Sequence, residues 1–264
     1  MYSFDYARPA SIRDAASLLA AKPEARVLAG GQTLIGTLRM RLAQPSDLID
    51  LSAIPELKGI RADGGKISIG AMTTHAEVAA SDAVRRAIPA LAHLAGGIGD
   101  RQVRNMGTIG GSIANSDPAA CYPAGVLGLG ATIVTDRRSI PADSFFTGMF
   151  ETALAAGELI TAVEFPVPKR AGYVKFVQPA SRFALVGVFV SEGPGGLRVA
   201  VTGAGPCAFR VKAMEDALAK NFSPDAIKSI AVPASGLNSD LHASADYRSH
   251  LVGVVARRAV AAAG

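Results

Sequence analysis

The chain has 264 residues, of which 49% are hydrophobic and 19% charged, and its formal net charge is +5. This composition excludes a disordered chain, because disorder needs low hydrophobicity together with high net charge. It also argues against a nucleic-acid-binding protein, since the basic residues are dispersed and form no stripe interleaved with aromatic residues. The mild basicity suits an anionic cofactor or acidic partner subunits.

The sequence shows no pattern typical of a membrane span, a signal peptide or a metal site. No stretch reaches the roughly 20 apolar residues of a membrane-spanning helix, and residues 1–9 lack the apolar core of a signal peptide, so we expect a cytoplasmic protein. Cys121 and Cys207 are the only cysteines, and the four histidines are scattered. The chain therefore has no ligand set for a metal or an iron–sulfur cluster, and free thiols are expected rather than a disulfide.

Hydrophobic periodicity predicts the elements of the first part of the chain. It begins with a helix over 11–22, capped by Ser11 and ended by Pro23, and a strand over 26–29 that stops at the double glycine Gly30-Gly31. The expected elements that follow are a strand over 47–51, a hairpin pairing 57–61 with 66–70, helical segments over 74–80 and 84–95, a glycine-rich stretch over 96–111, a strand pair 131–135 and 139–141, and a strand over 159–165.

Pro166 and Pro168 stop the last of these strands and mark a predicted domain boundary. Beyond them the patterns predict strands over 173–177, 185–191 and 197–202, and then helices over 210–218, 225–230 and 245–262. Strands grouped before helices are typical of an α+β unit. We therefore expect two domains, 1–168 and 169–264, the first with subdomains of about 1–55 and 56–168.

Two segments rich in glycine and in hydrogen-bond donors are the candidate ligand loops. The first, Leu28-Ala-Gly-Gly-Gln-Thr-Leu-Ile, follows a strand, and its glycines would let backbone N–H groups approach a pyrophosphate, although a plain tight turn would have the same pattern. The second, Asn105-Met-Gly-Thr-Ile-Gly-Gly-Ser-Ile-Ala-Asn-Ser-Asp-Pro, is interpreted as a ligand-lining loop, with a structural glycine turn as the alternative. It differs from GxGxxG, which disfavours a nicotinamide site of the Rossmann type. The two loops together could clamp one long anionic cofactor.

These loops resemble those of the medium, FAD-binding subunit of molybdenum hydroxylases, the group of carbon monoxide dehydrogenase and xanthine dehydrogenase. The resemblance also covers Arg41-Leu-Ala-Gln-Pro, Ile69-Gly-Ala-Met-Thr-Thr-His-Ala-Glu and Leu241-His-Ala-Ser-Ala-Asp-Tyr-Arg, and so runs over nearly the whole chain. It implies an α+β fold: a two-part FAD-binding domain of the PCMH/vanillyl-alcohol-oxidase-like type, followed by a smaller α+β domain with a three-stranded antiparallel sheet and helices.

The resemblance also implies which residues bind the cofactor. Residues 28–35 and 108–112 would hold the pyrophosphate and ribityl chain of FAD, and residues elsewhere would line the flavin. The cofactor-binding residues predicted in this way are Leu28, Ala29, Gly30, Gly31, Gln32, Thr33, Leu34, Ile35, Thr74, Ile98, Thr108, Ile109, Gly110, Gly111, Ser112, Asn115, Asp117, Cys121, Ile160, Lys175 and Gln178. Two positions depart from the family, where many members carry Asp at Cys121 and several carry a basic residue near Gln178.

In that family the substrate is oxidised at a molybdopterin centre in a large subunit, and electrons pass through two 2Fe–2S clusters in a small subunit. The resemblance implies that this chain contributes FAD, reduces a final acceptor (NAD, a quinone-like carrier or oxygen), and works in a dimer of heterotrimers. We assign it no catalytic acid or base: His75 is interpreted as a helix-start residue, and Asp143 and Glu158 as solvated loop charges.

Two alternatives stay open. One is a self-contained FAD oxidoreductase resembling UDP-N-acetylenolpyruvoylglucosamine reductase, which would need its own proton donor. The other is a non-enzymatic binding protein whose glycine loops are only turns.

Overall fold

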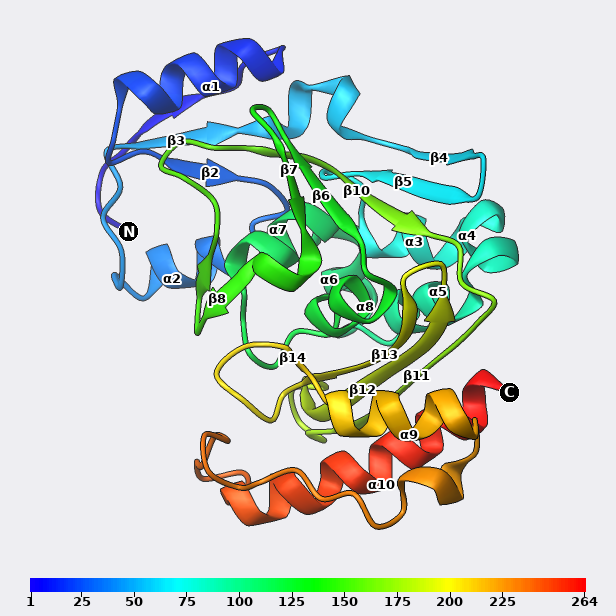
Figure 1. Ribbon diagram of the computed structural model, residues 1–264. Helices are drawn as coiled ribbons and strands as arrows, with labels where there is room; N and C mark the ends of the chain where they lie inside the picture. Colours follow the sequence, from blue (N-terminus) through cyan, green and yellow to red (C-terminus); the bar gives the residue numbers. More distant parts are fainter.

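The first lobe of the computed structural model, which describes residues 1–264, is a small parallel sheet covered by one helix (Figure 1). Its elements are β1 (Asp5–Ala7), α1 (Ile12–Ala21), β2 (Arg26–Leu28), α2 (Leu34–Arg39) and β3 (Asp47–Asp50), with strand order β1-β3-β2. Helix α1 begins where predicted, because the Ser11 hydroxyl accepts the Asp14 N–H at 3.1 Å. Strand β1 and helix α2 were not expected from the sequence.

The second lobe is built on a five-stranded antiparallel sheet. Its strands are β4 (Ile60–Asp63), β5 (Lys66–Gly70), β10 (Ile160–Pro166), β6 (Thr132–Thr135) and β7 (Ser139–Pro141), in the order β4-β5-β10-β6-β7. The predicted hairpin is present, but its first strand begins at residue 60, three residues later than the sequence predicted. Asp63 pairs with Lys66, so the turn consists of Gly64 and Gly65, both at positive φ.

Six helices pack beside this sheet where the sequence predicted two helical segments and a long glycine-rich loop. They are α3 (His75–Ala80), α4 (Asp82–Ala87), α5 (Pro89–Gly96), α6 (Arg101–Met106), α7 (Ile109–Asn115) and α8 (Tyr122–Leu129), followed by the short hairpin of β8 (Phe146–Gly148) and β9 (Glu151–Thr152). The loop prediction for the second glycine segment was therefore wrong. Thr108 caps α7 there through its side chain, and Ser116 ends it at φ 45°.

The third lobe is an antiparallel sheet with two helices on one face (Figure 1). Its elements are β11 (Arg170–Val177), β12 (Ala184–Gly193), β13 (Gly196–Thr202), β14 (Phe209–Arg210), α9 (Lys212–Lys220) and α10 (Ala245–Ala263). The sheet has four strands instead of the predicted three, because Phe209 and Arg210 pair with β13. The helix predicted over 225–230 is a single 3₁₀ turn, Pro224–Ile227.

Three apolar cores correspond to the three lobes. The largest core centres on β5, β10, α5 and α8, and it also includes Tyr173, Phe189, Ala200 and Ala208 from beyond Pro168. The other two lie under α1 and between the third sheet and α10. The division of the chain at residue 168 stays a prediction. None of the helices is both long enough and apolar enough to cross a bilayer.

Candidate cofactor site

A cavity of about 760 Å³ lies between the two glycine-rich segments and is walled by all three lobes. This volume lies within the range of small-molecule and cofactor sites. Most of the predicted site residues line it: Ala29, Gly30, Gly31, Gln32, Thr33, Leu34, Ile98, Thr108, Gly110, Gly111, Ser112, Asn115, Asp117, Cys121, Ile160 and Lys175. The residues that do not line it are Leu28, Ile35, Thr74, Ile109 and Gln178.

The first glycine segment supplies free backbone donors. The N–H groups of residues 29–34 have no acceptor within the protein, while Ala29 through Leu34 all line the cavity. Gly31, at φ +70°, turns the chain from β2 into α2, a backbone conformation that favours glycine. Consecutive unpaired amides at the start of a helix are suited to an anionic group such as a pyrophosphate.

The second segment forms a wall rather than an amide cradle. The N–H groups of Ile109 and Gly110 donate to the carbonyls of Thr73 and Ala71, at 3.1 and 2.9 Å. The Gly111 N–H donates to Thr108 Oγ1 at 3.1 Å. On this side, the hydrogen-bonding groups left free for a ligand are the Thr108 N–H and the side chains of Ser112 and Asn115. None of the three has a hydrogen-bond partner in the protein.

The two glycine segments touch each other. A Cβ on Gly30 would lie 2.0 Å from the Met106 carbonyl oxygen and 2.8 Å from Gly107 Cα, so only glycine permits this approach. A Cβ on Gly111 would lie 3.0 Å from Thr108 Oγ1 and 3.5 Å from Ala29 Cβ. Glycine at position 30 therefore serves first to bring the two walls of the cavity together, whereas at position 111 it leaves room for the Thr108 hydroxyl.

His75 lines the cavity, although its position in the sequence indicates only the start of a helix. It does begin α3 after the Thr74 cap, but it is 5% exposed, and its Nδ1 has no hydrogen-bond partner. Burial, with a further contribution from the Arg104 charge, lowers the pKa of His75 to about 4. Its ring lies 5.3 Å from the ring of Tyr122. Nothing in the pattern of residues around His75 signalled this burial.

The end of the cavity near the third lobe is polar. Lys175 Nζ donates to the carbonyls of Gly97 and Arg182, at 2.7 and 2.8 Å, and lies 3.4 Å from Cys121 Sγ. Asp117 accepts the Ala119 N–H at 2.9 Å, and burial raises the pKa of its carboxyl.

Gln178 was predicted to line the flavin but instead builds the turn between β11 and β12. Its Oε1 accepts the N–H groups of Ala180 and Ser181 at 2.6 and 2.8 Å. The residues of that turn that do line the cavity are Ser181, Arg182 and Phe183, none of which is among the predicted cofactor-binding residues.

The opposite end is apolar and lies against the first lobe, where it is lined by Leu19, Ala25, Leu51, Met72 and Leu159. Glu158 stands beside this end, and its interpretation as a solvated charge was wrong. It is 7% exposed and accepts hydrogen bonds from Arg138 at 2.9 Å and from Thr135 at 2.8 Å. These hydrogen bonds, above all the one from Arg138, lower the pKa of Glu158 to about 2, although burial acts to raise it.

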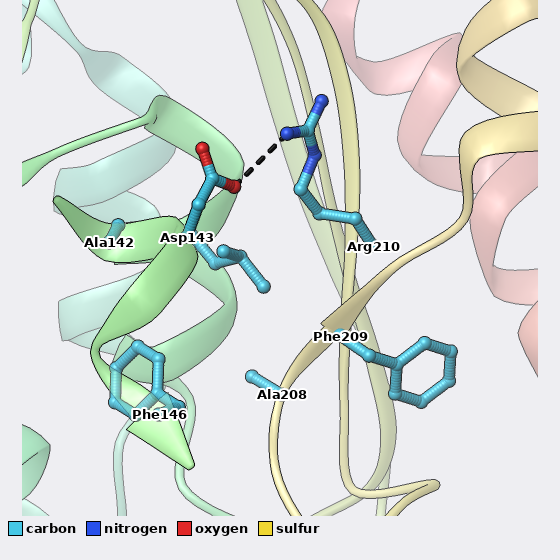
Figure 2. Close-up of a pocket in the computed structure, with 7 residues that line it drawn as sticks. Ala142, Asp143, Phe146, Ala208, Phe209 and Arg210 are labelled. Carbon is cyan, nitrogen blue, oxygen red and sulfur yellow. Dashed lines mark hydrogen bonds and ion pairs between the residues drawn. The ribbon is translucent and has the colours of Figure 1, made fainter. Parts of the chain in front are cut away.

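A second cavity, of about 160 Å³, lies where the second lobe meets the third (Figure 2). Asp143 stands at its edge and bridges two arginines, Arg198 at 2.9 Å and Arg210 at 3.0 Å. Asp143 is thus a link between lobes and not a freely solvated charge. This cavity is too small for a dinucleotide. No group of three or more His, Cys, Asp or Glu side chains is placed to hold a metal ion.

A cavity of this size, walled by free amides and two touching glycine segments, is typical of a dinucleotide-binding protein, and comparison with known proteins shows the family. The model of the FAD binding domain in molybdopterin dehydrogenase matches residues 2–168. The chain belongs to this family, which confirms the resemblance inferred from the sequence, the FAD cofactor and the oxidoreductase class.

Similar proteins extend over nearly the whole chain. It is 38% identical to the nicotine 6-hydroxylase medium subunit of Paenarthrobacter nicotinovorans, covering 98% of this chain and 96% of that protein. The structure of carbon monoxide dehydrogenase from Hydrogenophaga pseudoflava matches at 35% identity with a TM-score of 0.88, over 99% of this chain and 97% of the other. Quinoline 2-oxidoreductase from Pseudomonas putida 86 matches at 31% identity with a TM-score of 0.90, over the same shares.

Proposed function

We propose that this chain is the medium subunit of a molybdenum-containing hydroxylase, and that it passes electrons from the 2Fe–2S clusters of a partner subunit through FAD to a final acceptor. The single observation that carries the proposal is the cavity between the two glycine segments, with six consecutive unpaired amides on one wall. The cofactor supplies the redox chemistry, and the chain supplies binding, orientation and electrostatics.

The residues present suit such a cofactor. The amides of residues 29–34 hold the pyrophosphate from one side, and the Ser112 and Asn115 side chains complete its contacts from the other. The apolar end beside Leu51 and Leu159 receives the adenine, because a flat, weakly polar ring gains most from apolar walls. The polar end beside Cys121 and Lys175 receives the flavin ring.

The chain works with a large molybdopterin subunit and a small 2Fe–2S subunit, arranged as a dimer of heterotrimers in the cytoplasm. The two free thiols, Cys121 and Cys207, fit a reducing compartment. Residues 1–168 act as the FAD-binding domain and residues 169–264 as a C-terminal domain that closes the flavin end of the cavity.

The test is to purify the chain alone and then together with the large molybdopterin subunit and the small 2Fe–2S subunit. The isolated chain is expected to show the yellow flavin absorbance and to stay oxidised when mixed anaerobically with aldehydes, purines and N-heterocycles. Turnover should appear only when both partner subunits are added. Reduction of the flavin by a substrate without any partner would favour the self-contained oxidoreductase, and a colourless protein that binds no FAD would overturn the proposal altogether.

A further inference from the structure

Lys175 has a positive charge in the cavity wall that no carboxylate balances. None of the ion pairs in the structure includes Lys175. The two carboxylates that line the cavity make no ion pair with Lys175: Glu158 is bonded to Arg138, and Asp117 accepts the N–H of Ala119. An unbalanced cation beside a cofactor acts on any charge that develops on that cofactor.

The hydrogen-bonding capacity of Lys175 is already used within the protein. An ammonium group has three N–H donors. In this chain they meet the Gly97 carbonyl after α5, the Arg182 carbonyl in the β11–β12 turn, and Cys121 Sγ at the start of α8. The three acceptors come from three separate segments and fix the position of the ammonium, and all three are groups without a formal charge.

The residue at position 121 decides whether the positive charge of Lys175 is balanced, and here it is Cys121. Its side chain is 5% exposed and shares the cavity wall with Lys175. A thiol is a weak acceptor, so it holds the third ammonium proton without cancelling the charge. A carboxylate at the same position would lie within ion-pair distance of Lys175 and would cancel it.

We propose that Lys175 acts on the bound flavin through its charge and not through a hydrogen bond, and that Cys121 keeps this charge unbalanced, so that the pair raises the flavin reduction potential. Two-electron reduction with uptake of one proton leaves one additional negative charge on the cofactor. A fixed cation nearby stabilises the product of that step more than its starting state. This inference rests on the proposed function and deepens it by naming the pair that favours electron uptake.

The experiment compares Cys121→Asp with Cys121→Ser in the full-length chain carrying FAD, by anaerobic redox titration against a reference dye. Cys121→Asp is expected to lower the reduced-to-oxidised ratio at least tenfold at a fixed potential, which is about 30 mV for a two-electron couple. Cys121→Ser keeps an uncharged acceptor and is expected to change the ratio less than twofold. Lys175→Gln, which removes the charge directly, should shift the ratio in the same direction as Cys121→Asp.

Thermal melts and flavin content are measured on the same samples. Unchanged potentials in Cys121→Asp and Lys175→Gln, with FAD bound, would overturn the inference while leaving the proposed function in place. A lower melting temperature without a shift in potential would show that the pair is only a structural link and would also overturn it. If Cys121→Asp fails to fold, Lys175→Gln alone decides the question. Absence of flavin from the wild-type chain would instead overturn the proposed function.

Discussion

Gly30 lies so close to Met106 that a Cβ on residue 30 would be 2.0 Å from the Met106 carbonyl oxygen. This contact joins the first glycine segment to Met106, which ends α6 and lies in the second glycine segment. Backbone atoms cannot rotate away as a flexible side chain can, so the two segments would have to separate if any side chain were added.

Gly30→Ala is therefore expected to abolish FAD binding and to cost more than the typical 1–3 kcal/mol of an overpacking substitution. Flavin absorbance per protein and urea unfolding measure the two effects. Gly36→Ala is the matched control, because Gly36 lies in α2 with open space around its Cα. It should keep full flavin content and gain up to about 1 kcal/mol from helix propensity. Equal flavin content in the two variants would contradict the contact.

Gly111→Val is expected to lower flavin content severely for a different reason. Its Cβ would press on the Thr108 hydroxyl that caps α7, and its methyl groups would enter the gap facing Ala29. The comparison is Gly64→Val in the β4–β5 turn, where φ is +52° and no atom lies near. That variant should lose stability through backbone strain and keep its flavin stoichiometry. A Gly111→Val protein with one FAD per chain would disprove the assignment of this wall.

His75 should make the protein sensitive to mild acid. Its pKa is about 4 in the folded state, against 6.5 for an ordinary histidine, so between these values the unfolded chain binds more protons. Stability is therefore unaffected by His75 above pH 6.5, falls as the pH drops, and has lost about 3 kcal/mol below pH 4. Urea unfolding from pH 7 to pH 4 measures this loss. His75→Gln should flatten the dependence, whereas replacing the exposed His93 by Gln should leave it unchanged.

Glu158→Gln tests the buried carboxylate beside the apolar end of the cavity. The amide keeps the shape, but its single oxygen cannot replace both carboxylate oxygens: Oε1 accepts from Thr135 and from Arg138 Nε, and Oε2 accepts from Arg138 and from the Ala155 N–H. We expect a loss of about 1–3 kcal/mol in unfolding free energy, the usual cost of leaving buried partners unsatisfied. Glu151→Gln, at an exposed position of the short β8–β9 hairpin, should change stability by less than about 0.5 kcal/mol. A loss of equal size in both variants would show that the burial of Glu158 does not matter.

The sequence predicted the elements with clear amphipathic periodicity and the loops with unusual composition. It missed α8 because every residue from Tyr122 to Leu129 is buried, so the helix has no polar face to reveal its period. It missed α7 because two adjacent glycines, Gly110 and Gly111, oppose helix formation locally, and the capping by Thr108 and the contacts to Ala71 and Thr73 outweigh that preference.

Side chains that meet only through tertiary structure escaped prediction altogether. Glu158 and Arg138 are 20 residues apart and gave no local signal of pairing. The resemblance to the family implied that Gln178 would face the ligand. In the structure its side chain turns back to bond the amides of Ala180 and Ser181, and Arg182 and Phe183 reach the cavity instead.

The largest apolar core includes residues on both sides of Pro168, so a cut at this position would divide the core. Phe189 of β12 packs against Gly128 of α8, where even a methyl group would lie 2.8 Å from the Phe189 ring. Ser191 of the same strand donates to the Gly128 carbonyl at 2.7 Å. A fragment ending at residue 168 would expose the apolar face of α8 that packs against β12 and β13, and such a fragment is expected to aggregate. Because β11, which carries Lys175, pairs with β12, the same contacts also anchor the wall of the cavity that the third lobe supplies.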